Sequence, residues 1–183
     1  MRKRLFLIPF LFASAALAVD NPLERWAKAV GGSDKMAALK SIYREATIQY
    51  GAYEGTLKVW HTADGKYRKE EQVASYSLVE TFDGANGFVR LEGDNTIVLK
   101  PEGGVEWRVM LDPQTSLPKT MVHKEGEQTI TVTFDSYETV NGINFEKELH
   151  RSAGDPSRGA VIRFTKTIIN PATDASLFSI AAK

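Results

Sequence analysis

The segment TITVTFDSYETVNGINFEKELH, residues 129–150, decides the fold of this 183-residue chain. Polar and apolar residues alternate through its first six positions, which is the pattern of a β-strand with one buried face. Asn141 and Gly142 then stand between two runs of strand-forming residues, and this pair is the strongest short signal for a hairpin turn. The segment therefore predicts antiparallel strands joined by a tight turn.

The same two-residue alternation continues from Ile42 almost to the end of the chain. It predicts shared buried faces for two sets of apolar residues: Val105, Trp107, Val109 and Leu111 in one strand, and Ile162, Phe164 and Ile168 in another. Trp107, within the first set, is expected to face the interior. Glycine-containing turn signals separate the runs, and counting between them gives about ten strands. Because short links join antiparallel neighbours, the chain predicts one large meandering sheet.

A short helical region precedes the strands. Asn21 can cap it and Pro22 suits its first position. Gly31 and Gly32 interrupt the helical pattern, which then resumes over 33–41. A large sheet twists, curls and needs cover on its apolar face. The predicted fold class is therefore α+β and mostly β: a large curved antiparallel sheet, an incomplete barrel, covered by short N-terminal helices.

Residues 1–18 have the layout of a secretory signal peptide. Basic residues at 2–4 precede an apolar run over 5–12, and small residues end at Ala18, where a signal peptidase would cut. The apolar run is shorter than the roughly 20 residues that span a bilayer. We therefore expect cleavage after Ala18 and export of a single domain, residues 19–183.

The expected mature chain is weakly acidic and contains no cysteine. Three of the 23 basic residues leave with the signal peptide while all 23 acidic residues stay, which gives a net charge of −3. Such a chain is not a polycation, so we expect no nucleic-acid partner. The absence of cysteine excludes thiol catalysis, thiolate metal sites and a lipid-bearing cysteine in this chain.

The three histidines, His61, His123 and His150, do not form a recognisable metal site. No two have the helical spacing of a zinc site, and the chain contains no nucleophile elbow and no phosphate-binding glycine loop. His150 shares a predicted strand face with Glu146 and Glu148, which is either a metal or acid–base cluster or a solvated outer face. The second interpretation is favoured because the apolar residues of that strand fall on its other face. We expect no catalytic residue, no metal and no cofactor.

Apolar side chains on the predicted strands allow two interpretations. They form an ordinary core, or some of them line a hydrophobic cavity for a lipid or acyl chain, because a curved sheet with one helical cover often leaves a cavity. In the second case the opening helices would be the lid. The candidate lining residues are Leu57, Val59, Phe82, Trp107, Val109, Ile130, Val132 and Phe134.

Short motifs in a fixed order run through nearly all of the expected mature chain. They lie at 29–41, 55–60, 66–69, 78–88, 111–118, 134–145 and 169–178. In this order they resemble the LolA/LolB-like superfamily of periplasmic lipoprotein and lipid carriers, also known as outer-membrane lipoprotein-sorting proteins. The resemblance implies an incomplete barrel with helices over its concave side. It also implies a periplasmic, non-catalytic carrier in envelope trafficking, with a lipid or lipidated protein as its partner.

Two features depart from the family pattern. In the lipoprotein chaperone of this family, the strand matching 55–60 continues into Lys-Arg-Pro, whose arginine is tied to lid control and lipoprotein handover, whereas His61 stands at that place here. The segment between Phe88 and Leu111 is also shorter than expected in relatives, which suggests a smaller or more open cavity. The resemblance further allows an alternative function: a periplasmic protein-interaction or envelope-sensing domain with an envelope membrane protein as partner.

Overall fold

The computed structural model describes residues 21–178 apart from 84–86, 93, 102–103 and 156–157. The predicted signal peptide and its cleavage site lie outside the described residues. The helices are α1 (Pro22–Val30), α2 (Ser33–Ala37) and the 3-10 helix η2 (Ala175–Phe178). The strands are β1 (Ser41–Tyr50), β2 (Tyr53–Thr62), β3 (Lys66–Val73), β4 (Tyr76–Asp83), β5 (Gly87–Glu92), β6 (Thr96–Pro101), β7 (Trp107–Leu111), β8 (Pro118–Glu125), β9 (Gln128–Val140), β10 (Ile143–Ala153) and β11 (Ala160–Ile169).

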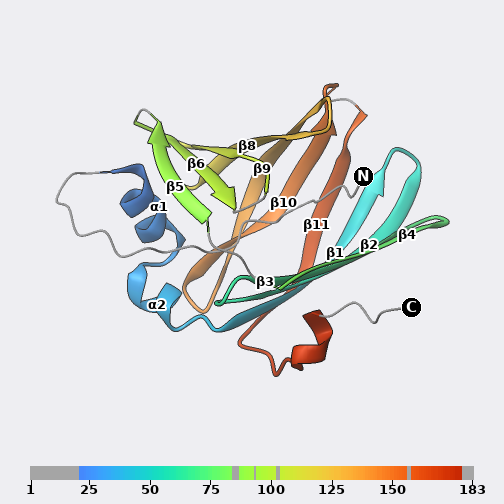
Figure 1. Ribbon diagram of the computed structural model, residues 1–183, viewed down its shortest axis with the longest axis horizontal. Coiled ribbons are helices and arrows are strands. Elements are labelled where there is room, and N and C mark those ends of the chain that lie inside the picture. The colour runs from blue at the N-terminus through green and yellow to red at the C-terminus, as the bar shows by residue number, and fades with distance from the viewer. Residues whose placement is uncertain (1–20, 84–86, 93, 102–103, 156–157, 179–183) are drawn as a thin grey trace.

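These strands form one antiparallel sheet in the order β4-β3-β2-β1-β11-β10-β9-β8-β7-β6-β5. The first and last strands of the chain, β1 and β11, pair in the middle of the sheet. β4 and β5 follow each other in the sequence but form the two edges, so the barrel is unclosed. Figure 1 shows β5 and β6 on one side of β9–β11 and β1–β4 on the other. The predicted fold class is confirmed, with eleven strands rather than about ten.

Helix α1 is attached to the sheet at two places. The Asn21 side chain caps it by accepting a hydrogen bond from the Glu24 amide at 2.8 Å, and the apolar residues Trp26 and Val30 are buried. The side-chain amide of Asn144, in β10, donates a hydrogen bond to the main-chain carbonyl of Ala29 at 2.8 Å. At the other side, the Arg25 guanidinium donates to the Asn95 side chain, between β5 and β6, at 3.0 Å. The helix therefore bridges β10 and the β5–β6 turn.

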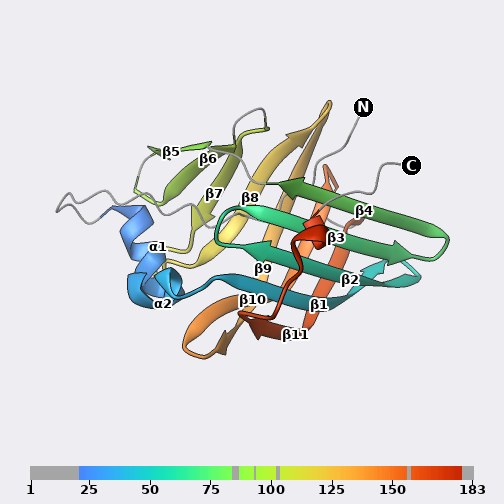
Figure 2. The ribbon, with the colours of Figure 1, turned by 60° about the horizontal axis from the view of Figure 1, so that its bottom comes forward.

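Besides α1, a short helix, η2, covers part of the sheet. The tail of the described chain, η2, packs against β3 and β4, where Phe178 is buried and the Leu177 carbonyl accepts a hydrogen bond from Arg68 at 2.9 Å. Figure 2 shows η2 lying across β3, on the side of the sheet away from α1. No helix in the described part of the chain has the length and apolar character that crossing a membrane requires.

The sequence-based face assignments of Ile168 and Val105 were wrong. Ile168 was expected to share the buried face of Ile162 and Phe164, but it is 36% exposed. The β1–β11 register shifts next to Glu45, and beyond this irregularity Ile169 instead packs against the core. Val105 lies before β7 and is 38% exposed, whereas the rest of its predicted set, including Trp107, is buried as expected. An irregularity of one residue reverses every later side chain of a strand.

Candidate functional site

The concave face of the sheet contains two neighbouring hollow spaces. The first, which we call the inner cavity, has a volume of about 100 Å³ and lies under α1, with Trp26 and Val30 in its wall. The second, the open groove, has a volume of about 510 Å³ and is lined by residues of β1–β4 and of β10–β11. Leu57, Arg151 and Ile162 line both spaces, so the inner cavity and the open groove adjoin.

All eight predicted lining residues lie in the core or pack against it. Those that line one or both of the two spaces are Leu57, Trp107, Val132 and Phe134. Those that line neither space are Val59, Phe82, Val109 and Ile130. The apolar alternation thus places these residues on the buried side, while the curvature of the sheet decides which of them reach a hollow.

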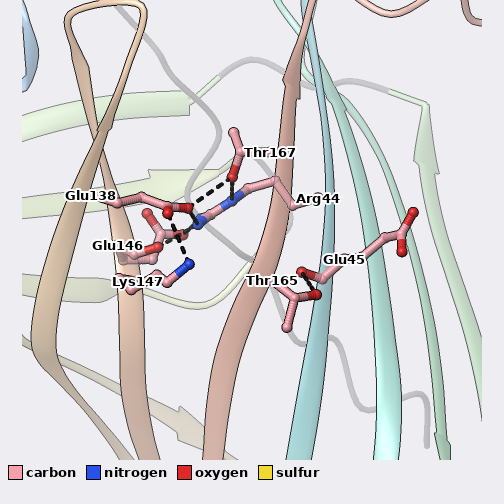
Figure 3. A network of polar contacts seen from close by, with 7 residues as sticks. All are labelled: Arg44, Glu45, Glu138, Glu146, Lys147, Thr165 and Thr167. Carbon is pink, nitrogen blue, oxygen red and sulfur yellow. Dashed lines mark hydrogen bonds and ion pairs between the residues drawn. The ribbon is translucent and has the colours of Figure 1, made fainter.

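A buried arginine, Arg44 of β1, stands in the wall of the inner cavity. Figure 3 shows its side chain beside Glu138, Glu146 and Thr167. Its side chain is 3% exposed, and its Nη1 lies 2.7 Å from Oε1 of Glu146. Its Nε donates to the Thr167 hydroxyl at 3.1 Å, and its Cζ lies 3.4 Å from the centre of the Phe164 ring. Burial lowers the pKa of Arg44, while the carboxylates of Glu146 and Glu138 oppose that shift.

The outer-face assignment of Glu146 was wrong. β10 has register irregularities between Glu146 and Leu149, so the strict alternation that placed Glu146 outside does not hold there. Its carboxylate lines the inner cavity and pairs with Arg44, and its main-chain carbonyl accepts a hydrogen bond from the same guanidinium. Glu148 does lie outside, where it pairs with the exposed Arg163 at 2.8 Å.

A second buried cation, Lys69 of β3, stands in the wall of the open groove. Its side chain is 1% exposed, and its ammonium lies 2.6 Å from Glu80 and 3.4 Å from Glu71. Two carboxylates therefore satisfy this charge inside the groove wall. Sequence reasoning missed both Arg44 and Lys69. Arg44 lies between the buried apolar residues Ile42 and Ala46 on the inward face of β1. Lys69, by contrast, lies between the buried Tyr67 and its own partner Glu71 on β3.

A third polar group joins β7, β8 and β10. The Trp107 ring stacks on the buried His123 ring, with centroids 4.1 Å apart. His123 Nε2 lies 3.2 Å from the Glu125 carboxylate, which also accepts a hydrogen bond from Arg151 at 2.9 Å. Burial raises the pKa of Glu125, but the His123 hydrogen bond and the Arg151 charge outweigh it and lower that pKa to about 2. Glu125 is therefore ionised at neutral pH.

His61, the residue at the position of the family's arginine, also lines the inner cavity. Its ring packs against the buried Tyr67 with a centroid separation of 4.9 Å. Burial, together with the positive charge of Arg44, lowers the pKa of His61 to about 3. The side chain is therefore a neutral imidazole in the folded protein.

The neutral state of His61 predicts that stability declines with acid. The folded-state pKa of His61, about 3, lies below its ordinary value of 6.5, so only the unfolded chain takes up this proton as pH falls between these values. The stabilisation is present above pH 6.5, and we expect a loss of up to about 2 kcal/mol from pH 7 to pH 5. Denaturant unfolding of the wild type and of His61→Gln measures this, and an equal decline in both proteins would contradict the assignment.

The polar groups of the concave face pair mainly with one another. Among the described residues, no group of three or more histidine, cysteine, aspartate or glutamate side chains is arranged to hold a metal ion. The arrangement is an apolar hollow whose few charges are fixed in place by ion pairs, which is the composition of a binding site for a mostly apolar molecule.

Several solved structures are similar to this chain at low sequence identity. The LolA superfamily protein NE2245 from Nitrosomonas europaea has a TM-score of 0.48 and 8% identity, over 87% of this chain and 96% of its own. A putative outer membrane lipoprotein-sorting protein domain from Vibrio parahaemolyticus has a TM-score of 0.46 and 10% identity, over 79% of this chain and 93% of its own. A DUF1329 family protein from Desulfovibrio piger has a TM-score of 0.45 and 11% identity, over 86% of this chain and 95% of its own.

Proteins bearing the name of the family that the sequence resembles are thus among these structures. No protein-family model and no curated protein matches the chain.

Proposed function

We propose that this protein is a periplasmic, non-catalytic carrier that holds a lipid or acyl chain in the open groove. The observation that carries the proposal is the groove itself, whose volume of about 510 Å³ falls within the range of ligand sites, roughly 300–1,000 Å³. Its aliphatic wall residues are Ile48, Leu57, Val73, Ala74, Ala160 and Ile162. Burial of an acyl chain against them is worth about 25 cal/mol per Å² of apolar surface.

The mouth of the groove suits an amphipathic ligand. Tyr50, Tyr53 and Tyr76 line it and are 53%, 61% and 53% exposed. A tyrosine ring offers an apolar body with a polar tip, so such residues suit the boundary between an apolar site and water. The inner cavity, at about 100 Å³, is too small for a whole lipid, but it adjoins the groove and has room for the end of a chain.

The periplasmic part of the proposal is supported by the signal-peptide pattern at 1–18. The carrier part is supported by the ion pairs of the concave face. Lys69 and Arg44 each form an ion pair with a carboxylate. The charges at these two positions of the walls are therefore neutralised within the protein. Lipoprotein transfer of the family's kind is not included, because His61 stands where the family has an arginine.

Filling the groove is expected to abolish binding of an apolar probe. Ala160 lies in the groove wall, so Ala160→Phe places a ring in the space that we assign to the acyl chain. We expect the affinity for the neutral fluorescent probe N-phenylnaphthylamine to fall by at least about tenfold, because the ring displaces the apolar contacts of the probe.

The matched control is Thr165→Phe, which adds the same ring to the same strand at an exposed position. Circular dichroism and thermal unfolding show whether each variant is folded. Equal probe affinity in folded Ala160→Phe and wild type would contradict the assignment of the groove as the binding site.

One observation favours the alternative, a protein-interaction or envelope-sensing domain. β4 is an eight-residue edge strand whose outer side has no strand partner among the described residues, and its Val79 is 44% exposed. An edge of this kind can accept an extended peptide as an additional strand. Under this alternative, Val79→Pro would abolish capture of a partner from an envelope extract while leaving probe binding in the groove unchanged.

A further inference from the structure

We infer that the ligand of the open groove is a single-chain amphiphile with an anionic head group, a carboxylate or a phosphate, and that Arg151 binds this head group. The inference rests on the proposed function and goes beyond it by naming the chemistry of the ligand. Arg151 of β10 lines both the open groove and the inner cavity.

Arg151 is the most accessible of the three cations that line these spaces. Arg44 and Lys69 are 3% and 1% exposed and lie against their carboxylate partners. Arg151 is 28% exposed, so a ligand in the groove can reach its guanidinium without breaking into the wall. An anionic ligand therefore meets this cation first.

The hydrogen bonds of Arg151 leave donors for a ligand. An arginine carries five N–H donors, and the Nη2 group of Arg151 donates to Glu125 at 2.9 Å. Its Nε is buried and has no hydrogen-bond partner among the described residues. Its partner carboxylate is shared, because Glu125 also lies 3.2 Å from His123. The Nε atom is not open to the groove, so a carboxylate or phosphate head group would bind the accessible part of the guanidinium and add oxygen acceptors there.

The surroundings of Arg151 account for the rest of the ligand. The aliphatic residues Leu57 and Ile162 line the same two spaces as Arg151, and Ala160 lies opposite it in the β10–β11 pair. An acyl chain bound to these walls places its charged end within reach of Arg151. A narrow groove with one accessible cation fits one chain and one head group.

Competition against N-phenylnaphthylamine tests the inference with three probes of equal chain length: decanoate, decyl phosphate and decanol. We expect the wild type to bind one or both anions about tenfold more tightly than decanol. Preference for decanoate or for decyl phosphate identifies the source of the head group. In Arg151→Gln the anion preference should disappear while the affinity for decanol stays unchanged.

Two further variants test whether a change in anion preference is specific to Arg151. Arg163→Gln removes an arginine that is also paired with a glutamate, but on the outer face, and it should retain the preference. Glu125→Gln removes the competing carboxylate and should strengthen the preference for anions even if Arg151→Gln fails to fold. Equal binding of all three probes, or an anion preference that survives Arg151→Gln, would overturn the inference and leave the carrier proposal standing. Failure of every probe to bind would overturn both.

Discussion

Glu146→Gln is expected to destabilise the protein by about 3 kcal/mol, because it leaves the charge of a buried arginine without its closest partner. Arg44 is 3% exposed and lies 2.7 Å from the Glu146 carboxylate, whereas its other carboxylate neighbour, Glu138, is 3.8 Å away. Glu138 is also engaged by Lys147 at 2.9 Å. Glu138 therefore cannot replace Glu146, and denaturant unfolding should show the loss directly.

The matched control is Glu148→Gln, which breaks the exposed pair with Arg163 two residues farther along β10. This change should cost less than about 1 kcal/mol, because exposed ion pairs contribute little. The double variant Arg44→Met with Glu146→Gln should recover much of the stability by removing the unpaired charge. If Glu146→Gln and Glu148→Gln have equal effects, the buried ion pair does not have the role that we assign to it.

The second large effect is expected at Gly55, which lies opposite Val73 in the β2–β3 pair. A Cβ atom at this position would lie 2.0 Å from the carbonyl oxygen of Gln72 and 2.7 Å from Cγ2 of Val73. Since one obstacle is backbone, the two strands must separate. We expect Gly55→Ala to cost about 3 kcal/mol, and thermal unfolding should show a melting temperature lower by roughly 6–12 °C.

Gly51→Ala distinguishes this crowding from ordinary backbone strain. Gly51 has a positive φ of 60°, but a Cβ there would meet no atom within 4 Å. The expected cost is therefore only the roughly 1 kcal/mol of a left-handed conformation in a residue with a side chain. A Gly55→Ala protein as stable as the wild type would show that β2 and β3 are not packed as described.

The sequence predicted the parts of the fold that depend on local patterns. Alternation placed Trp107 and Val132 on the buried side, and the Asn141-Gly142 turn gave the β9–β10 hairpin. The irregularities in β10 and β11 were not predicted, because an inserted or shifted residue leaves the apolar pattern ambiguous. They reversed the expected faces of Glu146 and Ile168.

The candidate site could be predicted only in its apolar part. Arg44 and Lys69 occupy inward positions of β1 and β3. Burial of a charged side chain can be predicted only when the carboxylates that pair with it are known. Those partners, Glu146 and Glu80, come from β10 and β4, and the register of the strands decides which carboxylate reaches which cation. Pairing of β1 with β11, from opposite ends of the chain, has no local sequence signal.

Native mass spectrometry of the protein purified from the periplasm shows whether the open groove holds a lipid or acyl chain. We expect the wild type and Thr165→Phe to carry a non-covalent adduct of lipid mass, and Ala160→Phe to carry none. Organic extraction of the same samples should recover the lipid from the first two proteins only. Wild-type protein that shows only its own mass and yields no lipid on extraction, or an adduct that persists unchanged in folded Ala160→Phe, would contradict the account.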